Sequence, residues 1–196
     1  MTDATFYRWL FTFLFAGAWV VWFALWAVMA LRVKAAAQSE GFASHLSHFG
    51  PLIVAGCLLA APRLPIPLLY ERFVPLALWP SALGAALTFA GLVVCAWARF
   101  VLAGNWSSYV EVKHDHELVV AGPYRWVRHP IYTGLLLMFT GTALAVGEWR
   151  GVLAVAIAAA AFWRKLRLEE TVMREEFAAA YVAYAERTHA LIPFVL

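Results

Sequence analysis

Long apolar stretches separated by short polar segments are the feature that most restricts the fold of this chain. Five stretches stand out in the sequence, at residues 6–31, 49–61, 74–100, 131–146 and 151–162. A helix needs about 20 apolar residues to cross the hydrocarbon core of a bilayer. The first and third stretches reach that length, whereas the second must use flanking residues if it spans. We therefore predict an all-α, multi-pass integral membrane protein with about five transmembrane helices.

The composition excludes an ordinary soluble domain. The chain has 196 residues, of which 64% are hydrophobic and 14% charged, and its mean hydropathy is +0.73. Soluble globular chains are nearer half apolar and a quarter charged. The length fits a single domain, and the first apolar stretch is too long for the core of a signal peptide. Cys57 and Cys95 lie in apolar stretches without partners at metal-ligand spacing, so we expect free thiols and no metal site.

The distribution of cationic residues predicts the orientation in the membrane. Five spans would place residues 104–130 and the segment after residue 163 on the same side. That side would carry eleven of the fifteen Lys and Arg residues: Arg32, Lys34, Arg99, Lys113, Arg125, Arg128, Arg164, Lys165, Arg167, Arg174 and Arg187. The other side would carry four, namely Arg8, Arg63, Arg72 and Arg150. Because cytoplasmic loops are enriched in Lys and Arg, we expect the first side to face the cytoplasm.

One polar stretch of unusual composition, HELVVAGPYRWVRHPIYTG, runs from His116 to Gly134 between two apolar blocks. Gly122-Pro123 and His129-Pro130 interrupt any helix, because the residue before a proline is pushed out of the helical region. The stretch is therefore a shaped loop that leads into a helix at about Ile131. From these residues alone, an aromatic and basic loop anchored at the lipid headgroups is an equally good interpretation.

The polarity also changes after the fifth apolar stretch. Beyond Arg164, apolar residues recur at helical intervals among charges: Leu168, Val172, Phe177, Tyr181 and Tyr184. This pattern indicates an amphipathic helix outside the bilayer core.

Two segments resemble the isoprenylcysteine carboxyl methyltransferase family, whose wider group of integral-membrane enzymes includes phospholipid N-methyltransferases. The first is HxLVxxGPYxxVRHPxYTG, and the second is LEETVMREEFAAAYVAYAERTHALIP. Together they cover roughly residues 104–193, whereas the first hundred residues match only in hydropathy. The resemblance divides the domain into variable helices at 1–103 and a cofactor-binding catalytic half at 104–196. It implies transfer of a methyl group from S-adenosyl-L-methionine to a lipophilic small molecule or lipidated acceptor at the membrane–cytoplasm boundary.

The resemblance also implies which residues would form the cofactor site. These are His116, Glu117, Leu118, Val119, Tyr124, His129, Pro130, Ile131, Tyr132 and Glu169. Backbone groups of residues 117–119 would contact the adenine, and His129 and Tyr132 would hold the amino-acid tail. Glu169 would supply an acid for the ammonium group or the ribose. Without the resemblance, the two tyrosines are better explained as interfacial anchors.

Four charged residues near Glu169 are candidates for catalysis or acceptor binding: Lys165, Arg164, Arg167 and Glu170. Lys165 lies one helical turn before Glu169 and could hold an anionic acceptor beside the cofactor. The family usually has Arg at this position, and Lys lacks the planar fork that binds a carboxylate in bidentate fashion. Arg164 or Arg167 could compensate. The Phe-Gly pair common in the family is Phe177-Ala178 here, a change that we expect to be neutral.

The chemistry of the acceptor stays open at this stage. A carboxylate is ionised at neutral pH and needs no base, whereas an amine must lose a proton, for which His129 or Glu170 would be the base. A phospholipid amine and a thiol are therefore alternatives within the same fold. A transporter or assembly protein is a more remote alternative, because four of the five stretches have no ionisable residue at mid-span. The basic residues follow the membrane boundary, so no nucleic-acid partner is expected; the sequence gives no indication of oligomeric state.

Overall fold

The computed structural model describes residues 3–31, 36–39, 42–60, 66–106, 111–113 and 117–192. Side chains are described for residues 11–31, 46–60, 66–106 and 117–192. The predicted cofactor residue His116 lies outside the described residues, as do Arg32, Lys34 and Arg63 of the charge count.

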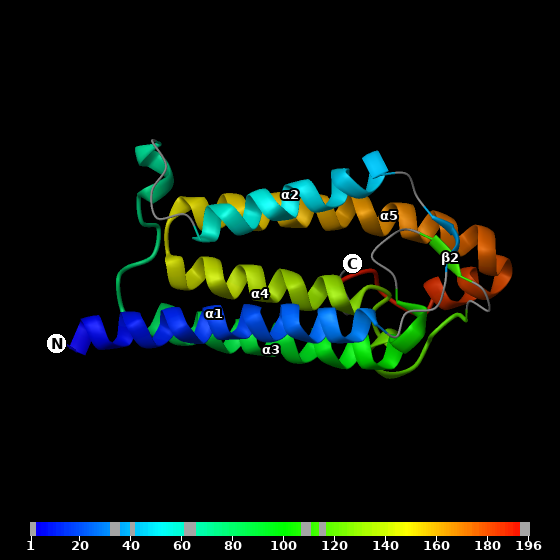
Figure 1. Cartoon of the computed structure of the whole chain (residues 1–196), viewed down its shortest axis with the longest axis horizontal. Coiled ribbons are helices and arrows are strands. Elements are labelled where there is room, and N and C mark those ends of the chain that lie inside the picture. The colour runs from blue at the N-terminus through cyan, green and yellow to red at the C-terminus, as the bar shows by residue number, and fades with distance from the viewer. Residues whose placement is uncertain are drawn as a thin grey trace.

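Five long helices make up most of the described chain: α1 (Asp3–Ala30), α2 (Phe42–Ala60), α3 (Leu78–Leu102), α4 (Pro130–Val146) and α5 (Trp149–Ala185). They lie along the long axis of the molecule, and successive helices run in alternating directions (Figure 1). α4 packs against both α3 and α5, while α1 packs on α3 and α2 packs on α5. The predicted helical architecture is confirmed.

The lengths of the helices bear on how they sit in a membrane. Within the described residues, Phe11–Ala30 and Leu78–Asn105 are long and apolar enough to cross a bilayer, and Leu46–Ala60 and Pro130–Val146 are shorter apolar helices. The number of crossings therefore stays a prediction.

α5 joins two segments that the sequence distinguished by polarity. The fifth apolar stretch and the amphipathic segment form one helix of 37 residues, because good helix formers such as Arg164, Lys165 and Leu166 continue it past the apolar part. The helix changes direction only at Ala178, where φ is 44° and ψ is −122°. An L-residue is disfavoured at positive φ and glycine is not. The expectation that Ala178 is a neutral replacement for glycine is therefore wrong.

Two short strands lie where α1 and α3 end. β1 (Ala36–Ser39) pairs antiparallel with β2 (Glu111–Lys113), with Ser39 opposite Glu111. β2 lies in the polar segment between α3 and the loop before α4. β1 was not expected, because its sequence reads only as a polar loop.

The contact between α3 and α4 depends on two pairs of glycines. Gly84 and Gly91 of α3 face Gly141 and Gly134 of α4, and a Cβ on Gly91 would collide with the carbonyl oxygen of Gly134. Small residues allow the backbones of two membrane helices to approach closely. The same contact fixes the start of α4, where Pro130 occupies the first turn without sacrificing a helical hydrogen bond.

We predict that Gly91→Ala lowers the melting temperature in detergent, because the added methyl forces α3 and α4 apart. Overpacking of this kind costs about 1–3 kcal/mol. Gly56→Ala in α2 is the matched control, since no atom outside the adjoining backbone of its own helix lies within 4 Å of its Cβ position. Its melting temperature should stay the same or rise slightly, because alanine favours the helix over glycine. Equal melting temperatures for the two variants would contradict the close contact.

Candidate functional site

A cavity opens at the end of the bundle where α3 finishes and α4 begins. Its wall carries several aromatic rings together with acidic and cationic groups. The aromatic lining residues are Trp106, Tyr124, Tyr132, Tyr181 and Tyr184, and the charged or titratable ones are Glu117, Arg128, His129 and Glu169. Such a combination suits a ligand with an aromatic ring and a zwitterionic part, because rings pack on the walls and charges pair with the polar groups.

Most of the predicted cofactor residues meet at this cavity. Those that line it are Glu117, Leu118, Val119, Tyr124, His129, Ile131, Tyr132 and Glu169. Pro130 is buried in the first turn of α4 and does not line the cavity. The loop before α4 contains the short 3₁₀ helix η3 (Gly122–Arg125), which Gly122 starts at a φ of 57°. This turn directs Tyr124 inward.

Glu169 is held by groups from both α4 and α5. The hydroxyl of Tyr132 donates to its Oε1 at 2.6 Å, and His129 Nδ1 lies 3.4 Å from its Oε2. Lys165, one turn earlier on α5, places its Nζ 3.9 Å from Oε1. The carboxylate side chain is 20% exposed, so it is sheltered but open to the cavity.

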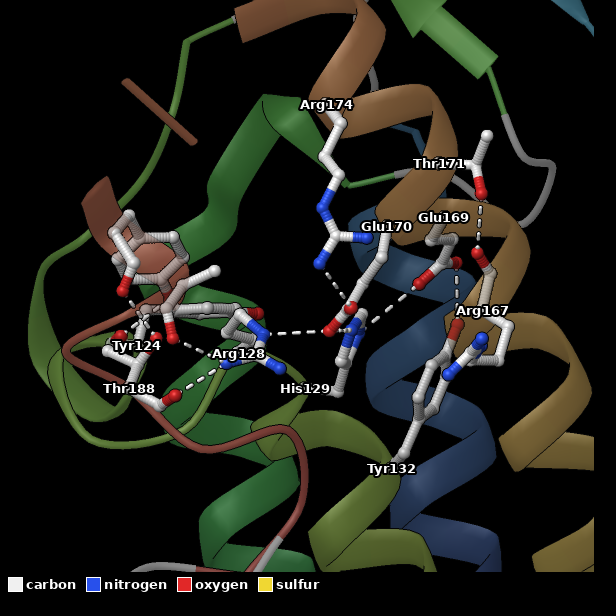
Figure 2. A network of polar contacts seen from close by, with 12 residues as sticks. Tyr124, Arg128, His129, Tyr132, Arg167, Glu169, Glu170, Thr171, Arg174 and Thr188 are labelled. Atoms are coloured by element: carbon white, nitrogen blue, oxygen red, sulfur yellow. Dashed lines mark hydrogen bonds and ion pairs between the residues drawn. The ribbon is translucent and has the colours of Figure 1, made fainter. Parts of the chain in front are cut away.

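Glu170, the next residue, faces a different set of partners (Figure 2). Arg128 Nε donates to its Oε1 at 2.7 Å, His129 Nε2 lies 3.4 Å from the same oxygen, and Arg174 approaches Oε2 at 3.5 Å. The imidazole of His129 therefore lies between two carboxylates, one at each nitrogen. Its ring also stacks on Tyr132 at 5.4 Å between centroids.

These contacts shift the pKa values of His129, Glu169 and Glu170. Burial disfavours the imidazolium, but the hydrogen bonds and charges of Glu169 and Glu170 outweigh burial and raise the pKa of His129. Burial likewise opposes ionisation of the glutamates. The contacts with His129 and Lys165 nevertheless lower the pKa of Glu169, and those with His129 and Arg128 lower the pKa of Glu170 to about 2. The two carboxylates thus favour the imidazolium form of His129, and His129 in turn favours their ionised forms.

None of the three predicted cations lines the cavity, and only Lys165 lies next to one of its lining residues. Lys165 is buried against Glu169 and the ring of Phe49. Arg164 instead donates to Ser47 Oγ at 2.7 Å on α2, and Arg167 is exposed over the ring of Trp163. Residues on a helix share a face at intervals of three or four, so only Lys165 lies on the face of Glu169. The structure does not bring Arg164 and Arg167 to the site.

Several residues of the site were not identified from the sequence. They are Leu102, Asn105, Trp106, Arg128, Val172, Met173, Tyr181 and Tyr184. Arg128 lies inside the first motif, but it was used only as one of the cations that predict the orientation in the membrane. Tyr181 and Tyr184 were interpreted as an amphipathic stripe, and their inward direction depends on the turn at Ala178.

Curated relatives share part of this sequence. A protein-S-isoprenylcysteine O-methyltransferase of Arabidopsis thaliana (form B) is 27% identical over 120 residues, which cover 60% of this chain and 61% of the relative. The enzyme of that name from Saccharomyces cerevisiae is 31% identical over 121 residues, covering 59% of this chain and 49% of the relative. This chain therefore spans less than two thirds of either relative, and the names confirm the resemblance in its motifs.

A solved structure shows the same fold. The structure is that of a eukaryotic intramembrane Ras methyltransferase, an isoprenylcysteine carboxyl methyltransferase, and it superposes with a TM-score of 0.56 at 22% identity. The match covers 78% of this chain and 52% of the other. The likeness extends through most of the helical bundle.

The family assignment follows from the part of the chain that builds the cavity. The sequence model of the phospholipid methyltransferase family matches residues 79–180, which is just over half of the chain. The match begins in α3, includes the loop before α4, and extends through Glu169 and Glu170 on α5. The chain belongs to the phospholipid methyltransferase family.

Proposed function

We propose that the protein is an integral-membrane methyltransferase that uses S-adenosyl-L-methionine and methylates a lipophilic carboxylate in the manner of isoprenylcysteine carboxyl O-methyltransferases. The observation that carries the proposal is the cluster of Glu169, His129 and Glu170, of which Glu169 and His129 line a cavity built mostly from residues within the family match. The names of the relatives agree with this reaction class.

The residues of the cavity fit the cofactor. Aromatic rings such as Tyr124 and Trp106 offer walls for an adenine, and the backbone of residues 117–119 offers hydrogen bonds to its edge. Glu169 is the acid for the ammonium group or the ribose, oriented by Tyr132 and His129. When bound, S-adenosyl-L-methionine supplies a methyl group already activated by its positively charged sulfur. The chain has then to position the acceptor and exclude water.

The charges around the site favour an acceptor that is already ionised. Glu170 is paired with Arg128 and its pKa is lowered to about 2, which makes it a weak base, and both ring nitrogens of His129 face carboxylates. An amine must lose a proton before it attacks, whereas a carboxylate is ionised at neutral pH. Lys165 is a buried cation next to Glu169 and is the residue that we assign to the acceptor anion. Arg164 and Arg167 are not assigned a role in binding the acceptor.

The orientation in the membrane completes the proposal. The alternating helix directions (Figure 1) fit five crossings, with the cavity on the side that carries eleven of the fifteen Lys and Arg residues. That side is the cytoplasmic one, with the N-terminus outside. A lipophilic acceptor would then reach the cavity from the bilayer, at the boundary where α5 passes from its apolar part to its charged part.

The acceptor class is tested with isotopically labelled S-adenosyl-L-methionine and the purified protein in lipid vesicles. We expect the label on a farnesylcysteine carboxylate, as a methyl ester that mild base releases. A phosphatidylethanolamine and a long-chain alkyl thiol are the parallel acceptors, and mass spectrometry identifies the products. Label on the amine or the thiol, with none on the carboxylate, would overturn the assignment of the acceptor while retaining the methyltransferase.

We predict that Glu169→Gln and Lys165→Met affect different steps. Glu169→Gln keeps the shape but loses the charge, and a charge-assisted hydrogen bond contributes about 1.5–3 kcal/mol, or about ten- to a hundredfold in cofactor affinity. Lys165→Met should leave cofactor affinity nearly unchanged and depress turnover. Lys165→Arg should retain or improve turnover, because it restores the planar fork. Calorimetry with S-adenosylhomocysteine gives the affinities, and the reverse pattern would mean that the two roles are exchanged.

The topology predicts how introduced cysteines react in intact cells. In a background with Cys57 and Cys95 replaced by alanine, Arg174→Cys should be protected from an impermeant thiol reagent, because it lies at the cytoplasmic end. Leu76→Cys is the control at the opposite end, where the native side chain is 69% exposed, and it should be labelled. Labelling of Arg174→Cys from outside would refute the orientation.

A further inference from the structure

The last segment of the described chain folds back over the cavity. After the turn at Ala178, residues 181–191, here called the C-terminal strap, pack against the loop at residues 124–133. The hydroxyl of Tyr184 donates to the carbonyl oxygen of Tyr124 at 2.7 Å, and the backbone N–H of His129 donates to Ala190 at 3.0 Å. Tyr181 and Tyr184 of the strap are buried and form part of the cavity wall. The strap is thus both the end of α5 and one side of the site.

One guanidinium joins this strap to the carboxylates. Arg128 donates its Nε to Glu170 at 2.7 Å, and its NH1 donates to the carbonyl oxygens of Ala185, at 3.1 Å, and Thr188. Its own backbone N–H donates to His189 at 2.8 Å. The side chain is 13% exposed and lines the cavity. Figure 2 shows it between Thr188 on one side and Glu170 with His129 on the other.

The same residue influences the charges that face the cofactor. Because Arg128 engages Glu170, that carboxylate remains ionised and is fixed next to His129 Nε2, 3.4 Å away. His129 then presents Nδ1 to Glu169. A displacement of Arg128 would therefore move a wall of the cavity and also disturb the contacts that orient Glu169.

We propose that Arg128 is a positioning residue for cofactor binding. It holds the C-terminal strap against the cavity, and it fixes Glu170 and, through Glu170, the imidazole of His129 that contacts Glu169. The proposal rests on the proposed function, since it takes the cavity as the cofactor site. Arginine suits this role because its rigid fork offers five N–H donors in one plane, and three partners are satisfied at once. A lysine provides the charge from a single nitrogen and cannot span the same set.

Two substitutions separate the two parts of the role. Arg128→Lys keeps the positive charge beside Glu170 and loses the bridge to the strap. Arg128→Gln loses both. Arg125→Gln is the matched control, because Arg125 lies in the same loop but is exposed over the ring of Trp126. Each protein is studied as the full chain in detergent.

The readouts are hydrogen exchange of the strap amides and the affinity for S-adenosylhomocysteine as a function of pH. For Arg128→Lys we expect faster exchange confined to residues 181–191 and at least about a tenfold loss of affinity. For Arg128→Gln we expect, in addition, that the acid limb of the binding profile moves to higher pH. The pKa of Glu170 is lowered by His129 and by Arg128, and in this variant only His129 and the half-exposed Arg174 still face the carboxylate. Arg125→Gln should behave like the unmodified protein in both measurements.

Two results would contradict the role of Arg128 as a positioning residue. Wild-type affinity and strap exchange in both Arg128 variants would overturn it. Faster exchange throughout α3 and α4 would also overturn it, because Arg128 would then contribute only general stability. If the unmodified protein does not bind S-adenosylhomocysteine, the proposed function fails instead, and the exchange of residues 181–191 in Arg128→Lys still tests whether the guanidinium fastens the strap.

Discussion

Two adjacent carboxylates on α5, Glu170 buried and Glu169 sheltered in the cavity wall, place the strongest demand on the rest of the structure. Neighbouring residues on a helix point about 100° apart, so Glu169 and Glu170 approach the imidazole of His129 from its two nitrogens. Burying a carboxylate is costly unless it is paired and hydrogen-bonded. Both are paired here: Glu169 by Tyr132 and His129, and Glu170 by Arg128 and His129. The start of α4 must therefore lie against the middle of α5, and the fold is arranged to keep it there.

Glycine contacts and a tight hairpin provide that arrangement. The facing glycines of α3 and α4, such as Gly91 and Gly134, set the height of α4 relative to α3. At the other end α4 closes on Gly147 in the left-handed conformation, with its N–H bonded to Ala143 at 2.8 Å. α5 begins two residues later, at Trp149. The short connection aligns the first part of α5 with α4, so that residue 169 returns to the level of residue 129.

Features that depend on a local sequence pattern could be predicted, whereas features that depend on contacts between residues far apart in the sequence could not. Hydropathy predicted the helices, and the two motifs predicted that Tyr132 and Glu169 belong to one site. The two side chains are hydrogen-bonded to each other although 37 residues separate them in the sequence. The role of Arg128 depends on the backbone carbonyl oxygens of residues 185 and 188. Because every residue has a backbone carbonyl, the residue types in the sequence do not reveal these contacts. The direction of Tyr181 depends on a single positive φ at Ala178. Arg164 and Arg167 were grouped with Lys165 by proximity in sequence, although helical geometry separates them.

The balance of charge around the carboxylates gives the last constraint on the chemistry. Glu169 and Glu170 face the cationic side chains of Arg128, Lys165 and Arg174 and the imidazole of His129, whose pKa the two glutamates raise. Arg174 is half exposed and is screened by solvent, so Arg128 and Lys165 are the sheltered cations that balance the two carboxylates. S-adenosyl-L-methionine would bring two further cationic centres, its sulfonium and its ammonium, and one carboxylate. An ionised carboxylate as acceptor would offset that added positive charge, whereas a protonated amine would increase it. Arg128 is already shared between Glu170 and two carbonyl oxygens. Lys165, which also contacts the ring of Phe49, follows the apolar stretch of α5 by three residues and is therefore the cation that we assign to a lipophilic carboxylate.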